Sequence, residues 1–163
     1  MMHPRIIAAH AGTGKTTLAK ARPDMYVDFV AMPYKYYLPD ACEENKESRK
    51  ADFSLEIRDE WPQNYVDAIL NDLKLHNKIL LIPPVGNVLH ALAEAGIKYH
   101  LCYPMRKLKE EYCKRYESRG NSTDFLFVFI DGWDGFIDSF EANTHGEHIV
   151  LDKGVYLSDV FSD

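Results

Sequence analysis

Residues 9–17 read Ala-His-Ala-Gly-Thr-Gly-Lys-Thr-Thr (AHAGTGKTT) and lie between an apolar run, RIIAA, and a helix-forming run, KTTLAKA. Gly12 and Gly14 allow the backbone to curl so that several N–H groups point into one concavity, as in many anion-binding loops. A helix that begins at Lys15 adds the positive end of its dipole to the same place. The stretch therefore predicts a strand, a phosphate-binding loop and a helix, in that order.

The loop follows the Walker A pattern, G-x-x-x-x-G-K-[ST], except that Ala9 stands at the first glycine position. In this pattern Lys15 reaches the β- and γ-phosphates of a nucleotide, and Thr16 supplies a hydroxyl to Mg²⁺. The alternative, a glycine-rich turn with an incidental lysine, leaves the surrounding strand and helix unexplained. The residues expected to bind phosphate are Ala11, Gly12, Thr13, Gly14, Lys15, Thr16 and Thr17.

Apolar runs and helical spacing alternate along the rest of the chain. The expected strands are residues 5–9, 25–30, 78–82, 97–103 and 148–151, and the expected helices are 15–21, 60–77, 85–95, 105–119 and 124–143, with a short terminal helix. This alternation predicts an α/β fold with a parallel sheet and helices on both faces. Ligands in such folds bind beyond the carboxyl ends of the strands.

Length and composition favour one folded domain, residues 1–163, since 46% of the residues are apolar. The formal net charge of -6 does not favour a generally basic surface for nucleic acid. Three scattered cysteines predict reduced thiols in a cytoplasm. The longest apolar or proline run, residues 79–85, is far short of the roughly 20 residues that span a membrane, so we expect no membrane partner.

Three stretches resemble the P-loop kinases of the nucleoside- and nucleotide-kinase type, and more closely a small family of phage and bacterial proteins of that kind. They are IIAAHAGTGKTTLA, MYVDFVAMPY, and KLKEEYCKRYESRGNSTDF with the later HIVLDKGVYLSDV, together about half of the chain. The resemblance implies a three-layer P-loop NTPase sandwich with strand order 2-3-1-4-5 and a small lid. It also implies ATP and Mg²⁺ as cofactors, phosphoryl transfer to a small acceptor and, for a phage-encoded member, the host cytoplasm.

Asp28 stands at the carboxyl end of the second expected strand. There it can accept a proton from an acceptor hydroxyl or hold a water of Mg²⁺. The alternative is a solvated carboxylate at a strand end. Relatives often carry a second acid two residues later, where this chain has Val30, and the third strand ends in Pro83-Pro84 without an acid. The latter departure disfavours a motor-type ATPase.

The segment 105–123 is expected to form the lid, and its first sixteen residues hold six Lys or Arg against three Glu. Arg115 and Arg119 are four residues apart and share one helix face. The resemblance implies that such arginines clamp the phosphates during transfer, for which their planar fork is suited. A solvated face with a Glu111–Arg115 pair is the alternative. By the same resemblance, Gly154 lies where adenine approaches the backbone.

These observations predict a Mg-ATP-dependent phosphotransferase acting on a nucleoside, a nucleotide or a similar small metabolite. Lys15, Asp28, Arg115 and Arg119 are its expected catalytic residues, Thr16 and Asp28 its expected metal residues, and residues 31–60 an insert on the acceptor side. Two alternatives stay open. One is a polynucleotide or a modified DNA base as acceptor, and the other is an ATP-binding interaction protein without catalysis. His10 is expected to face solvent unless it approaches the γ-phosphate or the acceptor.

Overall fold

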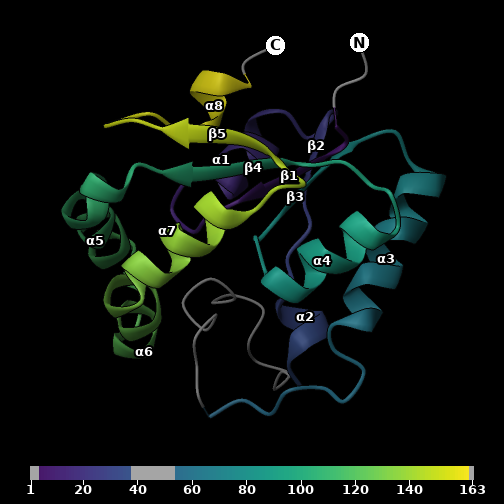
Figure 1. Ribbon diagram of the computed structural model, residues 1–163, viewed down its shortest axis with the longest axis horizontal. Helices are drawn as coiled ribbons and strands as arrows, with labels where there is room; N and C mark the ends of the chain where they lie inside the picture. Colours follow the sequence, from purple (N-terminus) through teal and green to yellow (C-terminus); the bar gives the residue numbers. More distant parts are fainter. Residues whose placement is uncertain (1–3, 38–53, 162–163) are drawn as a thin grey trace.

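The computed structural model describes residues 4–37 and 54–161 (Figure 1). Five parallel strands form one sheet in the order β2-β3-β1-β4-β5, which confirms the expected α/β class and strand order. The strands are β1 (Ile6–Ala9), β2 (Tyr26–Asp28), β3 (Ile79–Ile82), β4 (His100–Pro104) and β5 (Glu147–Leu151). All five strands overlap the ranges expected from their apolar runs.

Helices join the strands. They are α1 (Lys15–Ala21), α2 (Met32–Lys35), α3 (Gln63–Leu75), α4 (Gly86–Glu94), α5 (Lys109–Ser118), α6 (Thr123–Leu126), α7 (Trp133–Ala142) and α8 (Leu157–Val160). A 3-10 turn (η2, Arg106–Leu108) precedes α5, and a π-helical turn (η3, Phe127–Asp131) separates α6 from α7. The short α2 lies in the stretch that we expected to be irregular. The remainder of that stretch, from 38 to 53, lies outside the described residues.

The expected single helix over 124–143 is wrong, because the chain changes its winding twice there. Ser122 caps the start of α6 by accepting a hydrogen bond from the Phe125 N–H at 3.1 Å. At Gly132 the carbonyl oxygen of Val128 comes so close that a Cβ would lie 2.4 Å from it. A glycine is therefore required where the π turn gives way to α7.

Helices cover both faces of the sheet, and the alternation along β1 shows this directly. Ile6 and Ala8 pack into the cluster that includes α3, α4, α5 and α7, whereas Ile7 and Ala9 pack into the cluster that includes α1 and α8. In Figure 1, α3, α4 and α7 lie below the sheet, and α8 lies above it. Burial on both faces explains why β1 is an unbroken apolar run.

The strand order places a crevice at the carboxyl end of β1. This strand pairs with β3 on one side and with β4 on the other. The chain leaves β1 through α1 toward β2 and later crosses from β3 to β4 on the other side of β1. Such a switch point is where open parallel sheets bind ligands. None of the described helices is long and apolar enough to span a membrane.

Candidate active site

The loop between β1 and α1 has the geometry of an anion-binding loop. Gly12 and Gly14 have φ angles of 85° and 101°, which side chains rarely adopt. A Cβ on Gly12 would lie 2.8 Å from the ring of Tyr116. Within the described ranges, the N–H groups of Gly12, Thr13 and Gly14 donate no hydrogen bond to the protein. The loop therefore keeps donors for the oxygens of a phosphate group, which fits the expected nucleotide.

Lys15 begins α1 and is nearly buried although it is charged. Its ammonium donates hydrogen bonds to the carbonyl oxygens of Ala9 and His10, at 2.6 and 3.3 Å. A buried ammonium is tolerated only with such partners. Because both acceptors are neutral, an anionic phosphate oxygen at the loop is a stronger partner for the same side chain.

Thr16 and Asp28, the two expected metal residues, lie together. The Thr16 hydroxyl (Oγ1) donates a hydrogen bond to Asp28 Oδ2 at 2.8 Å, although the two residues come from α1 and from the end of β2. A hydroxyl and a carboxylate are oxygen ligands of the kind that Mg²⁺ prefers, alone or through water. The donor set therefore fits the expected Mg²⁺.

Arg115 contacts the phosphate loop from α5. Its guanidinium (Nη1) donates a hydrogen bond to the Gly12 carbonyl at 2.8 Å, and it lies 4.2 Å from the ring centre of Tyr112 and 4.1 Å from that of Tyr156. It also pairs with Glu111 at 3.3 Å, so the helical ion pair that we considered as an alternative is present as well. The ion pair with Glu111 does not exclude the expected phosphate contact, because the same guanidinium also reaches the phosphate loop.

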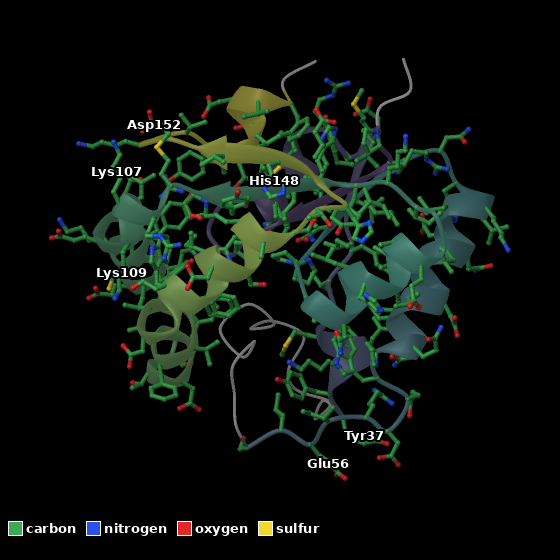
Figure 2. All side chains as sticks on the ribbon, in the orientation of Figure 1. Tyr37, Glu56, Lys107, Lys109, His148 and Asp152 are labelled. Atoms are coloured by element: carbon green, nitrogen blue, oxygen red, sulfur yellow. The ribbon has the colours of Figure 1, made fainter. Side chains whose placement is uncertain are left out.

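The other basic residues of segment 105–123 divide into three groups. Lys114 and Arg119 line the same cavity as Arg115. Lys107 in η2 and Lys109 at the start of α5 are exposed and point outward (Figure 2). Arg106 is engaged by carboxylates of α7, with its closest contact to Asp138 at 2.6 Å. The segment is therefore a cavity wall on one side and a solvated surface on the other.

Two tyrosines anchor α5 to the core. Tyr112 and Tyr116 are fully buried, and the Tyr116 hydroxyl donates a hydrogen bond to the Ala11 carbonyl at 2.8 Å. Burial raises the pKa of Tyr112 to about 12. In the structure α5 is a wall tied to the phosphate loop, and its opening as a lid stays a prediction.

A large cavity of about 770 Å³ opens above the loop. It is called the donor cavity below, because the expected nucleotide would bind there. The loop, α5 and the segment after β5 form its walls, through Gly12, Gly14, Lys15, Thr16, Thr17, Glu111, Lys114, Arg115, Ser118, Arg119, Gly154 and Tyr156. Arg115, Arg119 and Gly154, which the sequence predicted near the nucleotide, thus line the same cavity as the phosphate loop. The side chains of Ala11 and Thr13 are buried behind the loop instead, where the Thr13 hydroxyl donates to the His10 carbonyl at 2.7 Å.

A smaller cavity of about 110 Å³, here called the acceptor cavity, adjoins Lys15 and Asp28. Its walls are mostly apolar and come from α2, the ends of β2 and β3, and η3: Val30, Ala31, Met32, Lys35, Tyr36, Trp61, Pro83, Val85 and Phe129. The Lys35 ammonium lies 5.1 Å from the ring centre of Tyr36 and 5.8 Å from that of Trp61. Lys15 lines both cavities, and Asp28 lines the acceptor cavity.

The expectation that His10 faces solvent is wrong. His10 is 1% exposed, and its ring lies within 6 Å of four aromatic rings, those of Phe129, Trp133, Phe136 and Phe140. These rings recur at helical spacing through η3 and α7, and this spacing indicates in the sequence that they share one face. The spacing does not indicate which residue they pack against. Through Phe129, His10 connects the phosphate loop to the wall of the acceptor cavity.

Sequence reasoning also missed the roles of Tyr116 and Lys35. Tyr112 and Tyr116 are four residues apart on a charged helix, and this spacing is the signal for their shared buried face. Lys35 gave no signal, because it lies in the stretch expected to be irregular.

Comparison with known proteins does not assign the chain to a family. A scan against protein-family models and a search of curated proteins both find no match for the chain. The resemblance to P-loop kinases therefore stays a prediction, supported by the loop, the Thr16–Asp28 pair and the two cavities.

Proposed function

We propose that the protein transfers the γ-phosphoryl group of Mg-ATP to a small acceptor of the nucleoside, nucleotide or similar metabolite class. The observation that carries this proposal is the position of Lys15, which lines both the donor cavity and the acceptor cavity. A phosphoryl group held by this lysine is accessible from both sides, as an in-line transfer requires.

On the donor side, the N–H groups of Gly12 to Gly14 and the Lys15 ammonium bind the β- and γ-phosphates. Thr16 and Asp28 would hold Mg²⁺, which would neutralise phosphate charge when bound. Arg115 lies 2.8 Å from the Gly12 carbonyl and exchanges this neutral acceptor for an anionic phosphate oxygen. These groups stabilise the charge on the group in transfer.

On the acceptor side, Asp28 receives the proton of the attacking hydroxyl or orients it. The acceptor oxygen bonds to the γ-phosphorus, the bond to the bridging oxygen of ADP breaks, and ADP leaves. The apolar walls of the acceptor cavity, with Trp61 and Tyr36 beside Lys35, suit a planar group.

The test is a panel of acceptors incubated with ATP labelled at the γ-phosphate. The panel holds nucleosides, nucleoside monophosphates, other small alcohols and single- and double-stranded DNA. Wild type and Lys20→Ala, a control at an exposed lysine of the same helix, are expected to label a small acceptor, whereas Lys15→Ala labels none. ATP binding without any labelled acceptor would favour the non-catalytic alternative, and unchanged ATP affinity in Lys15→Ala would overturn the proposal.

A further inference from the structure

The strand β5 is the outer edge of the sheet on the side of β4, as Figure 1 shows. Its odd-numbered residues turn their backbone groups toward β4: the Glu147 N–H donates to the Tyr99 carbonyl and the Leu151 carbonyl accepts from the Met105 N–H, both at 3.0 Å. Backbone direction alternates along a strand. The N–H and C=O groups of His148 and Val150 therefore point outward, and no described strand lies beyond them.

The side chains of β5 also alternate. Ile149 and Leu151 pack with the cluster that includes α1 and α8. His148 lies on the opposite face, where its ring is 2.8 Å from the Tyr103 hydroxyl, and Val150 on that face is 46% exposed. The edge therefore presents a half-exposed valine between two polar ends, and Figure 2 shows His148 on the strand and Asp152 beyond its carboxyl end.

The sequence 147–153, EHIVLDK, is complementary to itself when it is read in the antiparallel direction about Val150. Glu147 then lies opposite Lys153, His148 opposite Asp152, and Ile149 opposite Leu151. Glu147 with Lys153 is then a pair of opposite charges and Ile149 with Leu151 an apolar pair, the kinds of cross-strand neighbours that stabilise a ladder. The His148 ring contributes no charge pair, because its nitrogens contact the Tyr103 hydroxyl at 2.8 Å and the Asn143 carbonyl at 2.6 Å. His148 and Val150, whose backbone groups point outward, are the strand residues that exchange hydrogen bonds in this register. Asp152 and Lys153 meet the partner from the turn that follows β5, where the Asp152 carbonyl accepts a hydrogen bond from the Val155 N–H at 3.1 Å.

Neighbouring registers lose this match. Moving one strand by two residues in one direction places Glu147 opposite Leu151, and moving it in the other direction places Ile149 opposite Lys153. Both shifts set a charged residue against an apolar one. The register centred on Val150 is therefore specified by charge as well as by backbone direction.

We propose that a second copy of this chain pairs with β5, antiparallel and about a two-fold axis through Val150. The interface is isologous and makes one continuous sheet from the two copies. It places the partner's Glu147 beside Lys153, next to Gly154, which lines the donor cavity. The proposal does not depend on the proposed function. The competing explanation is that the charged ends keep this edge from pairing.

The first test is sedimentation velocity of the full chain over a wide concentration range. Wild type is expected to show a concentration-dependent equilibrium between monomer and dimer. Val150→Pro removes an outward N–H without removing a hydrogen bond of the sheet, and we expect it to remain monomeric. Val150→Ile keeps that N–H and is the matched control, while circular dichroism verifies that each variant is folded. A wild type that stays monomeric up to about 1 mM, the range of very weak association, overturns the proposal.

The second test reverses charges and does not rely on proline. Lys153→Glu sets a carboxylate against the partner's Glu147 at both ends of the ladder, and we expect the dissociation constant to rise about tenfold. The double variant Glu147→Lys with Lys153→Glu restores opposite charges and is expected to return to wild-type association. Equal association of Lys153→Glu and wild type, or no recovery in the double variant, would show that this register is wrong.

Discussion

The Thr16 hydroxyl donates a hydrogen bond of 2.8 Å to Asp28, and this bond joins the phosphate loop to the end of β2. The strand between them in the sheet, β3, ends in Pro83-Pro84 and offers no acid. Asp28 therefore supplies the carboxylate at this edge of the site. In the proposed reaction, one side chain would therefore serve both a Mg²⁺ ion and the acceptor hydroxyl.

Replacing Asp28 by Asn keeps an oxygen that accepts from Thr16 but removes the negative charge and the base. We expect phosphoryl transfer to fall by about 10² to 10⁴, the usual contribution of a positioned base, and the affinity for Mg-ATP to fall as well, because Asp28 is also an expected Mg²⁺ ligand. Initial rates with the acceptor found in the panel, together with calorimetric titration of ATP, measure both effects. Asp24→Asn, at an exposed aspartate four residues earlier, is the control. Transfer at the wild-type rate in Asp28→Asn would remove Asp28 from the mechanism.

Replacing Gly12 by Ala tests the fit between the loop and α5. An alanine at position 12 would have to keep a backbone φ of 85°, which is strained. Its Cβ would also lie 2.8 Å from the Tyr116 ring, so a clash results. We expect the free energy of unfolding to drop by about 2 to 3 kcal/mol, against about 1 kcal/mol for Gly120→Ala. Gly120 has a φ of 76° with open space around it, so Gly120→Ala loses stability only through backbone strain. Equal losses in urea unfolding would contradict the packing described here.

Replacing Arg115 by Ala removes the guanidinium that spans Tyr112, Tyr156 and the Gly12 carbonyl. We expect the turnover number to fall by about 10² to 10³, as when one preorganised donor is lost from a transition state. Lys114→Ala, on the same wall but 75% exposed, is the control and should keep its activity. Arg115→Lys should not recover the rate, because an ammonium lacks the planar fork. Recovery in Arg115→Lys would mean that charge alone matters.

The stability of the protein should fall in alkali. Burial raises the pKa of Cys102 to about 12, and it also raises the pKa of Tyr112 to about 12. A group whose pKa is raised by folding stabilises the protein below its ordinary pKa, and this stabilisation is lost as the pH rises to the folded value. Between about pH 9 and pH 12 we therefore expect the free energy of unfolding to decrease, by up to about 1.4 kcal/mol per pH unit for each group.

Urea titrations from pH 7 to pH 12 measure this decrease. Tyr112→Phe and Cys102→Ala each remove one titrating group, so their stability should decline less steeply than that of wild type, above about pH 9 for Cys102→Ala and above about pH 10 for Tyr112→Phe. Curves that run parallel to wild type over the whole range would show that neither group is coupled to folding.

The sequence was sufficient to predict those elements whose structure depends only on neighbouring residues. The strand expected over residues 5–9 and the helix expected over 15–21 have nearly the bounds that the structure gives, Ile6–Ala9 and Lys15–Ala21. A buried apolar run and the glycine-rich turn that follows it leave the chain few other local structures. Asp28 could also be placed, because a parallel sheet gathers its carboxyl strand ends on one edge.

Contacts between distant parts of the chain could not be predicted in this way. His10 is buried by rings that follow it by more than a hundred residues, and Tyr116 meets Ala11 from across the site. The break at Gly132 depends on one carbonyl of the preceding turn. In each case the sequence shows a suitable residue, but the partner that decides its role is chosen by tertiary packing.

The two tryptophans of the chain stand at different ends of the proposed reaction. Trp133 lies with its ring centre 5.9 Å from that of His10 in the phosphate loop, and Trp61 lines the acceptor cavity. Indole emission changes with its surroundings, so Trp133→Phe leaves Trp61 as a fluorophore at the acceptor cavity, and Trp61→Phe leaves the buried Trp133, which reports only changes transmitted to it through His10. The order in which the two substrates bind can thus be followed by intrinsic fluorescence, without any added label.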